Sequence, residues 1–187
     1  MNNKKNKKII VSRIVPDDVI KLMKPFNFKS MYELGNKITN GIPYSVFYRK
    51  LGIQYISIDI NGRNGALKLD LTKPINLKSR DMVSNIGTTE HVINQEAVFR
   101  NIHNLSHFRM VHWVPIEKER INHGFYGYNE LFFLNLCELN NYEIEKFYKD
   151  TDRHLICCSF KKTDDKEFVW DTNRLKIYKN ERIENVK

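Results

Sequence analysis

The stretch from Tyr55 to His91 decides the fold, and its sequence is YISIDINGRNGALKLDLTKPINLKSRDMVSNIGTTEH. It contains apolar runs that each end in polar residues: Tyr55–Ile60, Ala66–Leu71 and Met82–Ile86. The first run closes on Asp59, the second closes on Asp70, and the third leads into a glycine turn. Acids and a glycine turn at the carboxyl ends of short buried strands are typical of a nucleotide site in an open α/β sheet. The stretch therefore predicts strands whose ends either hold a ligand or form ordinary turns.

Helices and further strands alternate on both sides of this stretch. Pro16-Asp17-Asp18 is typical of a helix start, with proline and acids in the first turn. The remaining pattern predicts strands at 30–34, 108–114, 142–148 and 155–162, and helices at 43–51, 94–105 and 129–139. Strands that alternate with helices indicate a mostly parallel sheet covered on both faces. The last two strands suit a hairpin, which adds an antiparallel strand.

The composition predicts one folded domain with a charged segment at either end. The chain has 187 residues with 41% hydrophobic and 12% aromatic content, which suits one domain with a substantial core. Residues 1–13 carry five of the positive charges and no acid, within a net charge of +9, so they predict a flexible basic tail. We therefore expect a tail at 1–13, a domain at 14–162 and an exposed, charged extension at 163–187.

Cysteine usage and hydropathy indicate a cytoplasmic protein. No apolar run approaches the length of a membrane span, and the N-terminal charges are not followed by the apolar core of a secretory signal. Cys137, Cys157 and Cys158 are odd in number and lack the paired spacings of a zinc site. Buried free thiols in a reducing cytosol explain them better than disulfides do. The sequence predicts no membrane segment and no metal.

In their order and spacing, these motifs resemble the class I S-adenosylmethionine-dependent methyltransferases over roughly residues 16–162. The segments that carry the resemblance are ELGN at 33–36, IDI at 58–60, DL at 70–71, DMVSNIGTTEH at 81–91 and HGFYGYN at 123–129. The first loop departs from the family pattern of several glycines, because Gly35 is followed by Asn36 and Lys37. The resemblance implies a Rossmann-like three-layer α/β sandwich with a seven-stranded sheet, and S-adenosylmethionine as the cofactor.

The resemblance places the cofactor at the strand ends. The carboxylate of Glu33 would suit the positively charged sulfonium and amino end, and Gly35 would let the backbone approach closely. Asp59 would accept hydrogen bonds from the ribose hydroxyls. Asp70 would accept from the adenine amino group, and Leu71 would cover the ring. The complete cofactor set implied is Glu33, Gly35, Asn36, Asp59, Asp70, Leu71, Asn85 and Gly87.

The methyl acceptor is expected beyond the fourth strand, beside Glu90 and His91. Since histidine titrates near neutral pH, His91 is the first candidate for a general base and Glu90 the second. Glu90 alternatively belongs to the first turn of a helix, where the helix dipole favours an acid. His123, Tyr126 and Tyr128 lie in a loop expected over the pocket. They are candidate substrate contacts, with plain packing of the tyrosines as the alternative.

Two other histidines are expected to take no part in the chemistry. His112 lies inside an apolar strand, so the sequence predicts a buried core histidine. His103 flanks the end of a predicted helix, so its side chain is expected to face solvent.

The sequence supports three hypotheses about function. The first is a methyltransferase that acts on an oxygen or nitrogen of a small acceptor, because the additions to the domain are small. The second is a nucleic-acid methyltransferase that uses the basic tail. The third is a catalytically inert binding or scaffold protein, suggested by the altered first loop. Fold does not fix function, and neither the acceptor nor the oligomeric state follows from the sequence.

Overall fold

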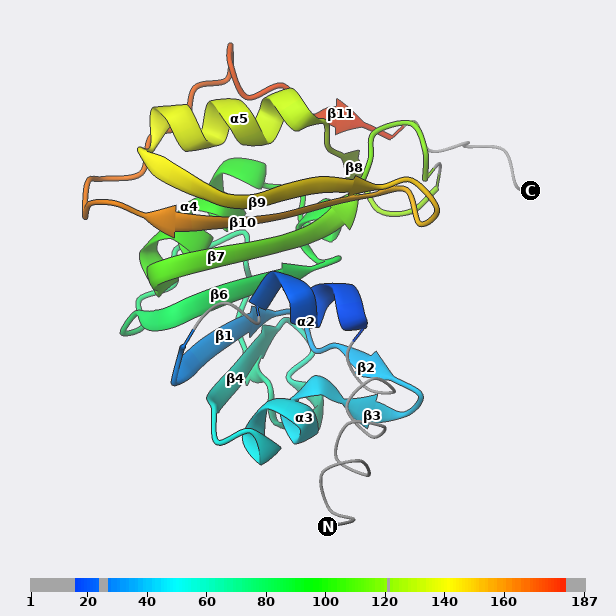
Figure 1. The fold of residues 1–187 in the computed structure, drawn as a ribbon, viewed down its shortest axis with the longest axis vertical. Helices are drawn as coiled ribbons and strands as arrows, with labels where there is room; N and C mark the ends of the chain where they lie inside the picture. Colours follow the sequence, from blue (N-terminus) through cyan, green and yellow to red (C-terminus); the bar gives the residue numbers. More distant parts are fainter. Residues whose placement is uncertain (1–15, 24–26, 121, 181–187) are drawn as a thin grey trace.

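The computed structural model describes residues 16–23, 27–120 and 122–180 of the 187-residue chain (Figure 1). Its centre is a seven-stranded sheet of order β5-β4-β1-β6-β7-β10-β9. The strands are β1 (Ser30–Leu34), β4 (Gln54–Asp59), β5 (Leu67–Lys68), β6 (Arg80–Ile86), β7 (Ser106–Pro115), β9 (Tyr142–Asp150) and β10 (Leu155–Lys162). The predicted basic tail at 1–13 lies outside the described residues.

The sheet is parallel except at β10, which is antiparallel to both β7 and β9. From β1 the chain continues to β4 and β5 on one side, and then to β6 and β7 on the other. The strand order therefore reverses between β1 and β6. In open α/β sheets, ligands bind at the carboxyl ends of the strands at such a reversal.

Helices cover both faces of the sheet, so the predicted three-layer α/β fold is confirmed. In Figure 1, α2 (Asp17–Met23) and α3 (Tyr44–Lys50) lie in front of the strands, and α4 (Gln95–Leu105) lies behind them. The side chains of α2 and α3 contribute to one apolar cluster, whereas those of α4 and α5 (Glu130–Leu139) contribute to the other. Among the described residues, no helix has both the length and the apolar character needed to cross a membrane.

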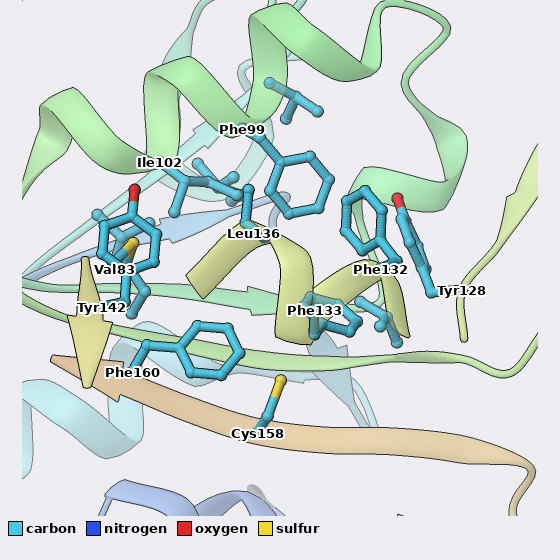
Figure 2. Packing of buried hydrophobic residues seen from close by; sticks show 14 of the residues in the cluster. Val83, Phe99, Ile102, Tyr128, Phe132, Phe133, Leu136, Tyr142, Cys158 and Phe160 are labelled. Atoms are coloured by element: carbon cyan, nitrogen blue, oxygen red, sulfur yellow. The ribbon is translucent and has the colours of Figure 1, made fainter. Parts of the chain in front are cut away.

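The core behind the sheet is rich in aromatic side chains. Figure 2 shows Phe99 of α4 facing Phe132 and Phe133 of α5, next to Phe160 of β10. The rings of Phe99 and Phe132 have centroids 5.1 Å apart in an edge-to-face arrangement, which is favourable for aromatic pairs. Asn129 begins α5 as predicted, because its side chain accepts a hydrogen bond from the backbone N–H of Phe132.

One predicted strand is shorter in the structure. The expected strand at 66–71 is paired only at Leu67–Lys68, because Asp70 already forms a turn with Thr72. The short 3-10 helix η1 (Arg63–Gly65) fills the linker before it.

Residues 163–180, the described part of the segment after Lys162, pack against the domain through several side chains. Its side chains Phe168 and Leu175 are both 4% exposed and belong to the aromatic core. Its last strand, β11 (Tyr178–Lys179), pairs with β8 (Tyr126–Gly127) in a small separate sheet. Over residues 163–180 the expected exposed extension is therefore anchored to the domain, because scattered apolar residues among its charges reach the core.

Candidate functional site

A cavity of about 510 Å³ lies at the carboxyl ends of β1, β4 and β6, where the strand order reverses. This volume falls within the range of small-molecule sites in proteins. Seven of the predicted site residues line the cavity: Gly35, Asn36, Asp59, Asp70, Leu71, Gly87 and His91. The other predicted residues do not line it.

The first loop is held closely against the loop after β6. Gly35 has a φ of +77°, and its N–H donates to the carbonyl of Ile58 at 2.8 Å. A Cβ at this position would lie 2.5 Å from Oγ1 of Thr88, which itself donates to the carbonyl of Leu34 at 2.7 Å. Only glycine fits this position, because both its backbone angle and its close neighbour exclude a side chain.

Asp59 joins the first loop to the end of β4. One carboxylate oxygen accepts from the backbone N–H of Asn36 at 3.0 Å, and the other accepts from that of Asn61 at 2.9 Å. A carboxylate has about four acceptor positions. Asp59 therefore has capacity for two further hydrogen bonds from a pair of hydroxyl groups in the cavity.

Asp70 and Leu71 form a second wall of the cavity. Oδ1 of Asp70 accepts from the hydroxyl of Thr72 at 2.7 Å and from its backbone N–H at 2.9 Å. Both bonds lower the pKa of Asp70, and the bond from the Thr72 hydroxyl has the larger effect. The carboxylate is therefore charged at neutral pH. Leu71 is 8% exposed and offers apolar surface beside it. An acceptor next to an apolar wall suits a flat ring with an amino group.

Lys37 is a cavity residue for which the sequence predicted no site role. Its Nζ donates to the carbonyl of Gly87 at 3.3 Å, so its ammonium lies across the loop after β6. Gly87 has a φ of +62°, and a Cβ there would lie 3.2 Å from Nζ of Lys37. Glycine at this position allows the ammonium to approach the backbone.

Glu33 lies away from the cavity, and its carboxyl group is fully buried. Tyr55 donates its hydroxyl to Oε2 of Glu33, whereas Oε1 has no hydrogen-bond partner among the described residues. Burial raises the pKa of Glu33 to about 8, despite the opposing effects of the Tyr55 bond and of Lys37. Because Glu33 does not line the cavity and burial disfavours its charged form, the structure does not support its predicted direct contact with a cationic ligand.

Asn85 also has a different place from the one predicted. It is fully buried, and its amide hydrogen-bonds to Oγ1 of Thr89 at 2.9 Å and to Nδ1 of His112 at 3.2 Å. Its carbonyl accepts from the backbone N–H of Thr89 at 3.1 Å. Asn85 therefore fixes the loop after β6 from behind instead of lining the cavity. His112 is a buried core histidine, as predicted.

The two predicted tyrosine contacts support the wall from outside the cavity. Tyr128 is fully buried, and its hydroxyl hydrogen-bonds with Oγ1 of Thr89 at 2.9 Å and Oε1 of Gln95 at 2.7 Å. Tyr126 donates its hydroxyl to the carbonyl of Ile93 at 3.0 Å. The packing alternative describes both tyrosines better than substrate contact does.

Glu90, His91 and His123 come together at one end of the cavity. Glu90 and His91 lie in the 3-10 helix η2 (Thr89–His91), and Nε2 of His91 is 3.8 Å from Oε1 of Glu90. Nε2 of His123 lies 3.5 Å from the same oxygen. Partial burial lowers the pKa of His91, although the nearby Glu90 opposes this effect. His91 lines the cavity, whereas Glu90 and His123 are its neighbours and do not line it.

The apolar wall at the His91 end of the cavity was not predicted from the sequence. Val92, Ile93 and Phe125 line the cavity here. Phe125 reaches it because its N–H donates to the carbonyl of Glu90 at 2.7 Å, across a long separation in sequence. Phe125 belongs to the HGFYGYN segment that was expected over the cavity, but only the histidine and the two tyrosines of this segment were predicted to contact the substrate.

Solved structures with a similar fold include methyltransferases and a cyclase. Magnesium protoporphyrin IX methyltransferase from Synechocystis PCC 6803, with bound SAH, has a TM-score of 0.60 at 11% identity, covering 86% of this chain and 84% of that one. A SAM-dependent methyltransferase from Aquifex aeolicus has a TM-score of 0.56 at 14% identity, covering 85% and 98%. The [4+2]-cyclase SpnF has a TM-score of 0.54 at 13% identity, covering 74% and 60%.

No family model matches the sequence, and no curated protein matches it significantly. The fold is that of the class I S-adenosylmethionine-dependent methyltransferases, as the resemblance predicted. The cyclase shows that this fold also carries other reactions, so the reaction has to be argued from the site.

Proposed function

We propose that the protein is an S-adenosylmethionine-dependent methyltransferase that acts on an oxygen or nitrogen of a small acceptor. The observation that carries the proposal is the cavity at the reversal of strand order, with Asp59 on one wall and Asp70 on another. Solved methyltransferases share this fold, and the structure of the magnesium protoporphyrin IX methyltransferase contains bound SAH. Cys137, Cys157 and Cys158 are buried and form no disulfide, which supports a cytoplasmic location for this chemistry.

The chemistry of the walls fits the parts of the cofactor. Asp59 has two acceptor positions left for the ribose hydroxyls, and Oδ2 of Asp70 is available for the adenine amino group. Leu71 would cover one side of the adenine ring. The methionine end would then extend toward Gly87 and the first loop.

In this arrangement the protein contributes mainly position and exclusion of water. The cofactor supplies an activated methyl group, and the protein would hold the acceptor atom roughly 3 Å from it, opposite the sulfur. Val92, Ile93 and Phe125 would shield this end of the cavity, which strengthens electrostatic interactions there. His91 is the predicted base that faces this end, and Glu90 remains the second candidate.

Isothermal titration calorimetry with S-adenosylmethionine and S-adenosylhomocysteine tests the proposal. Asp59→Ala and Asp70→Ala should each weaken binding roughly ten- to a hundredfold, since each removes hydrogen bonds to a charged acceptor. Asp171→Ala is a matched control, because Asp171 accepts from the N–H of Asn173 at 2.8 Å in a similar turn and does not line the cavity. Absence of heat at millimolar ligand would instead favour the inert binding protein.

A further inference from the structure

A cluster of potential metal ligands lies at the end of the cavity wall. Glu90 and His91 belong to η2, and His123 belongs to the loop before β8. The bond from the N–H of Phe125 to the carbonyl of Glu90 holds these two segments together at 2.7 Å. One potential ligand atom from each of Glu90, His91 and His123 lies within 4.8 Å of the others. The fold thus brings the imidazole of His123 to the adjacent residues Glu90 and His91, so that one carboxylate and two imidazoles meet.

Glu90 is the unusual member of this cluster. Its side chain is 0% exposed, and neither carboxylate oxygen has a hydrogen-bond partner among the described residues. The imidazole nitrogens at 3.5 Å and 3.8 Å are too distant for a good hydrogen bond. A buried carboxylate without a partner is strongly unfavourable, so it calls for a compensating positive charge.

We propose that Glu90, His91 and His123 bind one divalent transition-metal cation of the Zn²⁺ type. Ligand bonds of about 2.0–2.2 Å at a tetrahedral angle place two ligand atoms about 3.4 Å apart. The separations of 3.5 Å and 3.8 Å from Oε1 of Glu90 are close to this value, so small side-chain movements complete the site. Two imidazoles and one carboxylate suit Zn²⁺ and its first-row neighbours better than Mg²⁺ or Ca²⁺.

Three protein ligands leave one coordination position open, which is typical of catalytic rather than structural zinc. Because His91 lines the cavity, the open position would face the acceptor end. This further role rests on the proposed function. A cation there would lower the pKa of a bound acceptor hydroxyl, whose proton leaves to solvent. The oxygen then bonds to the methyl carbon, and the carbon–sulfur bond breaks with its electron pair remaining on sulfur.

This role specifies a hydroxyl acceptor and replaces the predicted general base. As a metal ligand, His91 would bind the cation through the lone pair of one ring nitrogen, while the other ring nitrogen carries a hydrogen. It could therefore not also remove the acceptor proton. It also revises the prediction of no metal, which rested on sequence spacing alone. The ligands come from two segments that only the fold brings together.

Lys37 is the competing positive group for Glu90. A Cβ at Gly87 would lie 3.2 Å from both Nζ of Lys37 and Oε1 of Glu90, so the two groups are neighbours across Gly87. Repulsion from the ammonium should weaken cation binding, so Lys37→Met should strengthen it. If Lys37 alone compensates Glu90, Lys37→Met should instead lower stability without any cation binding.

The test is calorimetric titration of the untagged full chain with Zn²⁺, after treatment with EDTA and removal of the chelator. We expect one cation per chain, and Co²⁺ should give the visible absorption of a low-coordinate site. Glu90→Gln, His91→Ala and His123→Ala should each weaken Zn²⁺ binding at least about tenfold. His154→Ala is the matched control, because His154 lies 3.3 Å from Glu119 in an exposed histidine–glutamate pair.

Failure to bind Zn²⁺, or wild-type binding by Glu90→Gln and His123→Ala, would overturn the inference. His123 is half exposed in a loop, so its variant should stay folded even where the Glu90 variant does not. The cofactor titration separates the two proposals. Binding of S-adenosylmethionine without Zn²⁺ leaves the methyltransferase proposal standing, whereas binding of Zn²⁺ without S-adenosylmethionine leaves only the cation site.

Discussion

Glu33 is a fully buried acid whose charge state should control stability. Its pKa is about 8 in the folded protein, against an ordinary value of 4.5. Between these values the folded state binds a proton that the unfolded state has released, so stability falls as pH rises through this window. Glu33→Gln should therefore match the wild type near pH 4.5 and exceed it at pH 8 by a few kcal/mol, with roughly 5 kcal/mol as the upper bound.

Urea unfolding of both proteins at several pH values measures this difference. Glu167→Gln is the control, because Glu167 has a side chain 94% exposed, so its substitution should give the same difference at every pH. A constant difference between wild type and Glu33→Gln across the pH range would show that Glu33 is already ionised in the folded state.

Acids at strand ends have similar positions in the sequence pattern, but the structure places them in different environments. Asp59 and Asp70 line the cavity, whereas Glu33 is fully buried and accepts a hydrogen bond from Tyr55 of the neighbouring strand β4. Alternation along a strand assigns faces, but it does not say which face carries the ligand and which is covered by a helix. The strand ends could therefore be predicted, while the separate environments of these acids depended on packing between distant segments.

His103 anchors the C-terminal segment to α4. Its ring nitrogens lie 2.6 Å from the hydroxyl of Tyr142 and 2.9 Å from the carbonyl of Lys166. The side chain is buried, which corrects the prediction that it faces solvent. Because its surroundings desolvate it, its pKa is lowered to about 4. Between this value and 6.5 the unfolded state binds more protons, so stability should rise with pH through this window.

His103→Ala should destabilise the protein by about 2–3 kcal/mol, since it removes buried contacts and two hydrogen bonds. It should also abolish this part of the pH dependence between pH 4 and 6.5. Hydrogen exchange at residues 166–170 should accelerate more than exchange in β1. The exposed His107 provides the control, and equal effects of His107→Ala and His103→Ala would contradict an anchoring role.

The elements with strong local signals could be predicted, and the C-terminal segment could not. α5 has its Asn129 cap and apolar run, and β10 has bounds that match the prediction at 155–162. The C-terminal segment has only isolated apolar residues among charges, because it follows the surface of α4 and α5 without regular periodicity. Its order comes from long-range contacts such as the bond from the N–H of Asn180 to the carbonyl of Phe125.

This segment connects the folding of the whole molecule to the candidate site. The side-chain amide of Asn180 donates to the carbonyl of His123, itself a proposed cation ligand, at 3.2 Å. His123 is close in sequence to Phe125 of the cavity wall. Earlier in the segment, Trp170 stacks near Phe99, with ring centroids 6.1 Å apart. Sequence reasoning placed a domain boundary at residue 162, whereas these contacts indicate that the described part of the segment folds with the domain.

The two tryptophans allow this to be tested, because they report on opposite faces of the sheet. Trp113 packs against the cluster of α2 and α3, and Trp170 packs against the cluster of α4 and α5. In a single cooperative unit, Trp113→Phe and Trp170→Phe should each give a fluorescence transition in urea that coincides with its own far-ultraviolet circular dichroism. An earlier Trp170 transition in Trp113→Phe would mean that the C-terminal segment detaches first and that a boundary near residue 162 is real. Coincident transitions would place Trp170, and the loop contacts that follow it, within the same folding unit as the sheet that forms the cavity.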